Sequence, residues 1–286
     1  MRGLILAGVL LAVSLTWAAA GAAPDEPSSQ DGSSHALILV GLPGDAAHDR
    51  LFAAVAGQWR DWLTNRLGFP PANVRILFGK DGKPDLARGP ATQEAIGQEV
   101  AGLKEALRPE DRLWVFCLGH GDYDGERASF HVPGPDLHGD DLHKLFAEVR
   151  CREQVFWMTT SASGWFLKPL SAKGRIVITA TAADDEYNET EFPHALATVA
   201  QLPPDKLDAN RDGKVSVLEV YRRTVAEVES RFAADKRAAT EHAQLDDNGD
   251  GAGTEEPVVE GEGKKATADG ALAARTFLPV KAKSKE

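Results

Sequence analysis

Residues 112–122 read RLWVFCLGHGD, an apolar run that leads into a glycine-flanked histidine. Six apolar residues follow Arg112, which is typical of a strand buried on both faces of a parallel sheet. The run ends in Gly119, His120 and Gly121, where the two glycines allow a sharp turn that exposes the imidazole. Ligands of such sheets bind beyond the carboxyl ends of the strands, so His120 is a candidate acid or base. The alternative is a turn histidine bonded to a backbone carbonyl.

Further apolar runs on both sides of this stretch extend the pattern. With residues 112–118, the expected strands are residues 36–40, 74–78, 154–160 and 175–180. The segments between them have the three- and four-residue apolar spacing of helices, at residues 51–62, 92–107 and 139–149. Strands that alternate with helices predict an α/β fold with a mainly parallel central sheet and helices on both faces.

The second candidate residue follows the strand at 154–160, where residues 159–166 read TTSASGWF. With GHG, RIVITAT (175–181) and NETEF (188–192), this segment resembles the legumain-type branch of the caspase/legumain cysteine peptidases, including its secreted bacterial relatives. The resemblance spans residues 35–202 and implies a three-layer caspase/legumain-like sandwich. In that clan, the histidine of the GHG turn and a cysteine after the next strand form the catalytic dyad. The resemblance places His120 at the family histidine and Ser161 at the nucleophilic cysteine.

Serine at position 161 changes the chemistry that the resemblance implies. A thiol beside a histidine readily forms a nucleophilic thiolate, whereas a serine hydroxyl needs an oriented base and an oxyanion hole. In addition, Thr159 stands where the family often has aspartate. We therefore expect a catalytically inactive peptidase homologue that acts as a peptide-binding or structural module. The alternative is an active hydrolase with a His120–Ser161 dyad, so whether the chain is an enzyme stays open here.

A different motif, DANRDGKVSVLE at residues 208–219, fits the twelve-residue calcium loop of an EF-hand. Oxygen ligands occupy the diagnostic positions, and Gly213 permits the sharp turn at position 6. The predicted Ca²⁺ ligands are Asp208, Asn210, Asp212, the Lys214 carbonyl, Ser216 and Glu219. A helix follows, so we expect a C-terminal helical EF-hand-like extension. The alternative is an acidic turn that binds nothing.

The start of this motif recurs as DDNGDG at residues 246–251. Here Asp246, Asn248 and Asp250 supply the first three ligand positions, but position 12 is Pro257. The segment is either a degenerate second calcium site or a structural cluster of turns in which Asp and Asn side chains cap the backbone.

The ends of the chain differ in composition from its centre. Residues 1–22 have the basic start, apolar run and small-residue exit of a signal peptide, with an uncleaved anchor as the alternative. A polar linker at 23–34 precedes the α/β domain at 35–202 and the EF-hand-like segment at 203–256. We expect residues 257–286 to be mostly disordered, apart from residues 276–280, which could dock. The predicted location is secreted or periplasmic.

The charge of the chain bears on its partners. Its 43 acidic and 32 basic side chains give a formal charge of −11, which argues against nucleic-acid binding. After signal cleavage no membrane association is expected, and the expected partner is a peptide or protein. A third hypothesis is a calcium-dependent structural or adhesion protein with the caspase-like domain as its scaffold.

Overall fold

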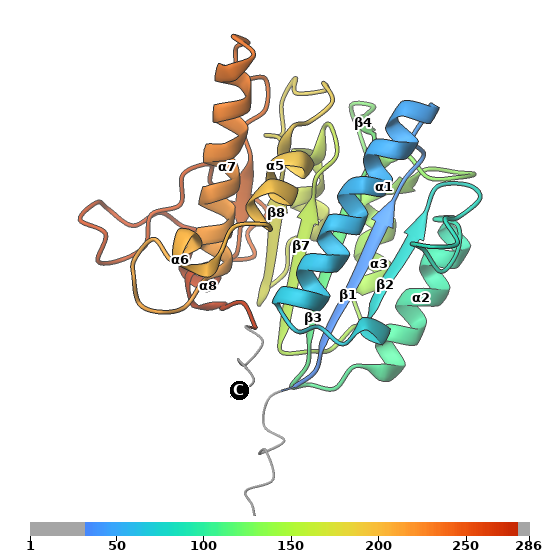
Figure 1. Cartoon of the computed structure of the whole chain (residues 1–286), viewed down its shortest axis with the longest axis horizontal. Helices are drawn as coiled ribbons and strands as arrows, with labels where there is room; N and C mark the ends of the chain where they lie inside the picture. Colours follow the sequence, from blue (N-terminus) through green and yellow to red (C-terminus); the bar gives the residue numbers. More distant parts are fainter. Residues whose placement is uncertain (1–31, 280–286) are drawn as a thin grey trace, which may run out of the picture. The chain divides into compact units, whose positions relative to one another are not determined.

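The computed structural model describes residues 32–279 and contains a central six-stranded sheet (Figure 1). The signal-peptide prediction and most of the linker, residues 23–31, lie outside the described residues. The strand order is β2-β1-β3-β7-β8-β9, in which the first five strands are parallel and β9 is antiparallel. The bounds are β1 Ser34–Val40, β2 Val74–Phe78, β3 Arg112–Leu118, β7 Glu153–Met158, β8 Arg175–Thr179 and β9 Gln244–Asp246. The predicted α/β class with a mainly parallel sheet is confirmed.

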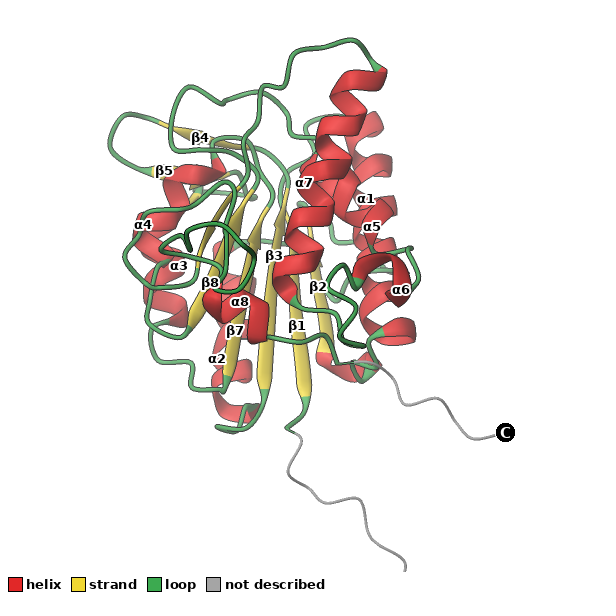
Figure 2. Ribbon diagram, turned by 90° about the vertical axis from the view of Figure 1, so that its left-hand side faces the viewer, coloured by secondary structure: helices red, strands yellow, loops and turns green. Residues whose placement is uncertain are grey.

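Helices cover both faces of this sheet, as Figure 2 shows. On one face lie α1 (Ala46–Asp61), which continues into a π-helical turn (Trp62–Arg66), α5 (Phe192–Val199) and α7 (Val217–Ala234). The other face carries α2 (Gln93–Ala106), α3 (Gly139–Phe146) and α4 (Leu167–Leu170). Short 3-10 helices lie at Pro71–Asn73 and Ser163–Phe166. The three layers are those expected from the sequence.

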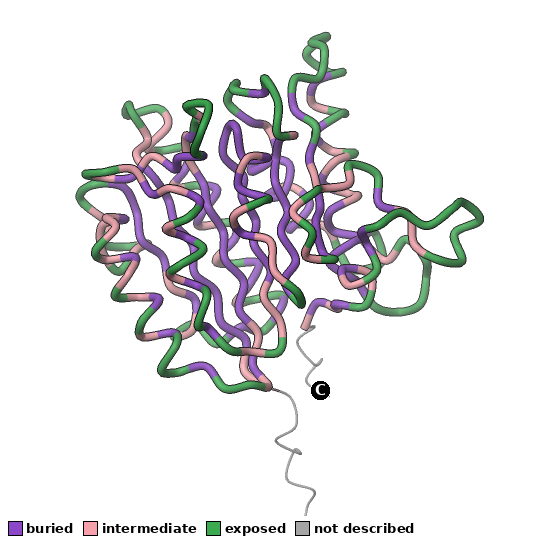
Figure 3. The backbone as a smooth tube through the Cα atoms, turned by 180° about the vertical axis from the view of Figure 1, so that it is seen from behind, coloured by how far each residue is buried: buried purple, intermediate pink, exposed green. Residues whose placement is uncertain are grey.

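Alternation along the strands divides the core in two. Successive strand side chains point to opposite faces, so Phe116 packs in the core beneath α1 while Cys117 packs in the core beneath α2. The strands are buried along nearly their whole length (Figure 3). Phe116 and Trp157, on adjacent strands, stack with ring centroids 6.2 Å apart. Burial on both faces explains why these strands read as continuous apolar runs.

A second, three-stranded antiparallel sheet begins directly after His120. It consists of β4 (Gly121–Tyr123), β5 (Ala128–Phe130) and β6 (Leu137–His138). The sequence did not predict these strands, since they are only two or three residues long and lack an apolar run. Their position holds the chain that leaves His120 close to the edge of the central sheet.

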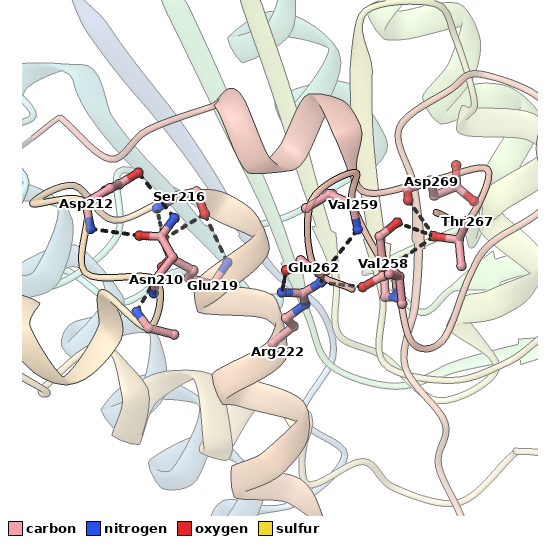
Figure 4. A network of polar contacts seen from close by, with 12 residues as sticks. Asn210, Asp212, Ser216, Glu219, Arg222, Val258, Val259, Glu262, Thr267 and Asp269 are labelled. Carbon is pink, nitrogen blue, oxygen red and sulfur yellow. Dashed lines mark hydrogen bonds and ion pairs between the residues drawn. The ribbon is translucent and has the colours of Figure 1, made fainter. Parts of the chain in front are cut away.

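The C-terminal segment packs against the rest of the described structure. It contains α6 (Pro204–Leu207), α7, β9 and α8 (Ala271–Arg275). The disorder expected from residue 257 onward is wrong for 257–279, because buried Asp247 caps α8 and Arg222 forms a bidentate ion pair with Glu262 (Figure 4). The Leu278 amide donates to the Val215 carbonyl oxygen at 2.8 Å, and residue 280, the last of the segment expected to dock, lies outside the described residues.

An α-helix that crosses a membrane needs about 20 consecutive, mostly apolar residues. Among residues 32–279, no helix is both long enough and apolar enough to cross a membrane.

Candidate functional site

The carboxyl ends of β3 and β7 bring the two predicted catalytic residues to one edge of the sheet. The strands are adjacent and parallel, with Cys117 opposite Met158, so the segments after them emerge side by side. The Gly121 amide lies 3.4 Å from the Ser161 Oγ and donates to it. Ser161 therefore lies against the residue that follows His120, and its side chain is buried.

Two glycines are required where the histidine segment passes its neighbours. Gly119 has φ +143, a region that L side chains rarely adopt. At Gly121, an added Cβ would lie 2.8 Å from the Ser129 carbonyl oxygen and 2.9 Å from the Ser161 carbonyl oxygen. Both glycines thus permit the close approach that holds His120 beside the turn containing Ser161.

His120 packs against the first turns of α1. Its ring centroid lies 5.4 Å from that of His48, edge to face, and 5.5 Å from that of Phe52. The Nε2 atom is 3.4 Å from the Pro43 carbonyl oxygen. This is the carbonyl contact expected for a turn histidine, but it occurs at the same sheet edge as Ser161.

His48 is a site residue that the sequence analysis missed. Its Nδ1 lies 2.9 Å from Asp45, the N-cap of α1, and its Nε2 lies 3.2 Å from Glu189. These carboxylates, Asp45 more than Glu189, raise the His48 pKa above its ordinary value. An imidazole donates through both nitrogens only when it is protonated, so this geometry suits the cation. The sequence signal was the pair Asp45 and His48, which follows the GLPG turn at residues 41–44 after β1.

The turn that carries Ser161 is fixed by backbone bonds on both sides. Before it, the Thr159 amide and hydroxyl both donate to the Cys117 carbonyl oxygen, at 3.0 and 2.8 Å. After it, Ala162 adopts a left-handed conformation with φ 51, and its amide donates to the Glu186 carbonyl oxygen at 3.0 Å. Such a turn holds Ser161 in one position relative to β3.

Ser163 has a structural role in the same turn. Its Oγ accepts hydrogen bonds from the amides of Ala180 and Thr181 at 2.9 and 3.1 Å, and its side chain is fully buried. The Gly164 amide donates to the Thr181 hydroxyl at 3.0 Å. These bonds tie the turn to the end of β8, so Ser161 rather than Ser163 is the candidate reactive hydroxyl.

An aromatic pair joins the histidine segment to the serine turn. Tyr123 and Trp165 stack with centroids 3.8 Å apart and rings 4° from parallel. Both line a cavity of about 440 Å³ that also includes Arg127 and Lys168. Tyr123 follows His120 by three residues and Trp165 follows Ser161 by four, while neither His120 nor Ser161 lines the cavity itself.

Neither cysteine of the chain lies beside Ser161 at the carboxyl end of β7. Cys117 lies inside β3, is fully buried, and burial raises its pKa to about 12. Cys151 precedes β7, at the opposite end of that strand from Ser161. Both are free thiols. A thiolate at the site would therefore require a cysteine that this chain does not place there.

Residues 94–194 match the sequence model of the Peptidase C13 family. This segment runs from α2 into α5 and contains both His120 and Ser161. The match supports the expected relationship to legumain/caspase-like peptidases. The chain is also similar to a Geobacter sulfurreducens protein of known crystal structure, with 13% sequence identity and a TM-score of 0.45. The similarity covers 75% of this chain and 92% of the Geobacter chain. No curated protein matches the chain.

The predicted calcium loop, residues 208–219, is ordered by its own side chains (Figure 4). The Asp208 carboxylate accepts from the amides of Asp212 and Gly213, at 3.1 and 2.9 Å. Asn210 Oδ1 accepts from the Asp212 amide at 2.9 Å, and Asp212 Oδ1 accepts from the Lys214 amide at 2.8 Å. Carboxylate and amide oxygens keep further lone pairs for a cation, so these bonds are compatible with a calcium site.

Glu219, at position 12, closes the loop from the first turn of α7. One carboxylate oxygen accepts from the Ala209 amide at 2.9 Å, and the other accepts from the Ser216 amide at 2.8 Å. Ser216 is the N-cap of α7 and forms a capping box with Glu219. Within residues 32–279, His, Cys, Asp and Glu side chains alone form no group of three or more that could hold a metal. The predicted donor set also uses Asn, Ser and carbonyl oxygens, so calcium binding stays a prediction.

The second acidic loop repeats these bonds. Asp246 accepts from the Gly251 amide at 2.9 Å, Asn248 from the Asp250 amide at 2.7 Å, and Asp250 from the Ala252 amide at 2.8 Å. Asp246 is buried at the end of β9 and also accepts from the Ser171 hydroxyl. A calcium loop and a structural turn both contain such bonds, so the two alternatives stay open.

Proposed function

We propose that this protein is a legumain-like peptidase homologue that has lost its thiol nucleophile and binds peptides at the carboxyl edge of the sheet. The observation that carries the proposal is the contact between the Gly121 amide and the Ser161 Oγ, which brings the family histidine and the Ser161 position together. His120 Nε2 faces the Pro43 carbonyl oxygen, and Ser161 accepts from a backbone amide. A serine whose base is not bonded to it is a weak nucleophile, which supports a binding role.

Ser161→Cys tests this proposal by restoring the family nucleophile. We expect the natural chain to cleave fluorogenic asparaginyl and arginyl peptides no faster than a His120→Ala variant. The Ser161→Cys variant should cleave at least one of them about 100-fold faster, since a thiolate paired with His120 is far more nucleophilic than the hydroxyl. Adding His120→Ala to Ser161→Cys should return the rate to background.

The active-hydrolase alternative predicts a different outcome. A serine hydrolase would react with a fluorophosphonate probe in its natural form and lose that reaction in Ser161→Ala. Such labelling would overturn the inactive assignment, whereas an inactive Ser161→Cys variant would contradict the intact peptide site.

We further propose that residues 208–219 bind Ca²⁺ in a secreted or periplasmic protein. Support comes from the oxygen-rich donor set of Asp208, Asn210, Asp212 and Glu219, and from the closure of the loop by Glu219. Calcium takes six to eight such oxygens in flexible loops of this length. Extracellular calcium would then stabilise the folded state by mass action, because the unfolded loop has no preformed site.

Calorimetric titration checks this calcium proposal. The natural chain should release or absorb heat on addition of Ca²⁺, and it should melt at a higher temperature in the presence of Ca²⁺. Glu219→Gln should bind Ca²⁺ at least tenfold more weakly, a loss on the order of 1.4 kcal/mol in binding free energy. Glu229→Gln, at an exposed position on α7, is the control and should bind normally. No heat and no shift in melting temperature would contradict the proposal. A stoichiometry that falls from two to one in Asp250→Asn would identify the second loop as a site.

A further inference from the structure

The loop between β8 and α5, residues 180–191, forms one wall of the candidate site. The Glu186 carbonyl oxygen accepts from the Ala162 amide at 3.0 Å, directly after Ser161. Trp165 Nε1 donates to the Asp184 carbonyl oxygen at 3.3 Å, and the Thr190 hydroxyl donates to the Thr159 carbonyl oxygen at 2.7 Å. The serine turn is therefore bonded to this loop at Asp184, Glu186 and Thr190, in addition to the bonds at Ala180 and Thr181 described above.

The Glu186 side chain fastens the middle of this loop to the C-terminal segment. It is 8% exposed. Its Oε2 accepts from the amides of Ala182 and His242, at 2.8 and 2.9 Å, and its Oε1 bonds to His242 Nδ1. The Glu186 carboxylate raises the His242 pKa above its ordinary value, which is consistent with a charge-assisted bond.

The preceding residue, Glu241, fastens the end of the same loop. Its Oε2 accepts from the Glu191 amide at 2.8 Å, at the start of α5. Two consecutive residues of the C-terminal segment thus hold the loop at Glu186 and at Glu191, more than 45 residues earlier in the chain.

We propose that His242 and Glu241 are positioning residues for the candidate site: His242 holds the Ala162 amide through Glu186, Glu241 holds the end of the same loop at Glu191, and together they fix the orientation of Ser161. The left-handed conformation of Ala162 is unfavourable for a residue with a Cβ, so external bonds must maintain it. The Glu186 carbonyl supplies such a bond only while its own side chain is held. The inference rests on the proposed function in treating Ser161 as the site residue.

Amide hydrogen exchange on the natural chain tests this coupling without any need for activity. His242→Ala should raise the exchange rate of the Ala162 amide about tenfold, since a hydrogen bond to a charged group is lost. His242→Asn should restore most of the protection, because its side-chain NH₂ can donate to Glu186 as Nδ1 does. His242 is 47% exposed, so both replacements leave the core intact. His143→Ala, at an exposed position on α3, is the control and should not change exchange at Ala162.

Kinetics in the Ser161→Cys background supply a second measurement. There, His242→Ala should lower kcat about tenfold with KM within about twofold, and His242→Asn should recover kcat, because the loss is one of nucleophile orientation. The inference would be overturned if His242→Ala left the exchange rate of the Ala162 amide unchanged. It would also be overturned if that amide exchanged as fast in His242→Asn as in His242→Ala. An inactive Ser161→Cys variant with the expected exchange pattern would instead overturn the proposed function alone.

Discussion

Replacing Glu241 with glutamine should remove a decline of about 4 kcal/mol in the free energy of unfolding between pH 4.5 and 8. Glu241 is 6% exposed, and burial raises its pKa from 4.5 to about 8. Its Oε1 is buried without a hydrogen-bond partner. The nearby carboxylates of Glu191 and Glu186 raise the pKa further, while the amides at the start of α5 lower it.

The direction of the pH dependence follows from proton binding. Because the folded pKa of Glu241 lies above the unfolded one, the folded state binds the proton more tightly. The contribution of the protonated Glu241 carboxyl to stability is complete below pH 4.5 and is lost as the pH rises through about 8. Over this range the free energy of unfolding falls by up to about 1.4 kcal/mol per pH unit. Glutamine cannot ionise, so Glu241→Gln should be more stable than the natural chain at pH 8.

Urea unfolding at half-unit pH steps measures this difference directly. The difference between the natural chain and Glu241→Gln isolates this carboxyl from the other titrating groups, among them His35 and His194, whose pKa values burial lowers. Glu229→Gln, which removes an exposed carboxyl from α7, should follow the natural chain at every pH. Parallel curves for Glu241→Gln and the natural chain would contradict the raised pKa.

Gly164→Ala should destabilise the protein by about 3 kcal/mol or more. A Cβ at Gly164 would lie 2.2 Å from the carbonyl carbon of Ala182 and 2.4 Å from both its oxygen and the Ala183 amide nitrogen. These are backbone atoms held by the bond between Ala182 and Glu186, so they cannot move aside cheaply. The turn and the loop would have to separate.

Gly97→Ala is the matched control for this substitution. Gly97 lies within α2, and the nearest atom to an added Cβ is a Leu145 methyl at 3.9 Å, an ordinary contact. Alanine is the better helix former, so this variant should be more stable by about 0.5–1 kcal/mol. Equilibrium unfolding in urea measures both variants. Equal stability of Gly164→Ala and Gly97→Ala would show that the turn can relax.

The central sheet could be predicted because its strands are buried on both faces. The bounds predicted for β2 and β3, residues 74–78 and 112–118, are those observed, since each mainly apolar run ends at a glycine, Gly79 or Gly119, with positive φ. Thr92, the first residue of the helix predicted at 92–107, is the N-cap of α2, and its hydroxyl accepts a hydrogen bond from the Ala95 amide. Local pattern and tertiary burial agree at these positions.

The small sheet, β9 and the C-terminal tail could not be predicted from local pattern. β4 and β9 have three residues each and depend on partners elsewhere in the chain, such as Ile178 opposite Leu245. The tail after residue 257 is polar, and it is ordered by specific bonds such as those that the Gly270 and Ala273 amides, at the start of α8, donate to the Asp247 carboxylate. The composition of a segment gives only its average polarity, which does not reveal individual hydrogen bonds of this kind.

Of the candidate site, only the residues that directly follow the strands could be predicted from the sequence. His120 and Ser161 each follow a strand, and adjacent parallel strands bring their exits together. His48 and Glu189 meet across 141 residues, and Glu186 and His242 across 56, so no local spacing indicates those pairs. Sequence reasoning found the residues at the strand ends but not the groups that hold them.

The antiparallel strand β9 has a consequence for the biogenesis of this protein. It pairs with the outer edge of β8. Glu241 and His242, just before β9, are hydrogen-bonded to the loop at residues 180–191. The ribosome synthesises the chain from its N-terminus. In a nascent chain that ends before residue 241, β8 is therefore an unpaired edge strand, and the loop at residues 180–191 lacks its bonds to Glu241 and His242. The loop beside Ser161 therefore reaches its final arrangement only late in synthesis, after residues 241–246 have emerged.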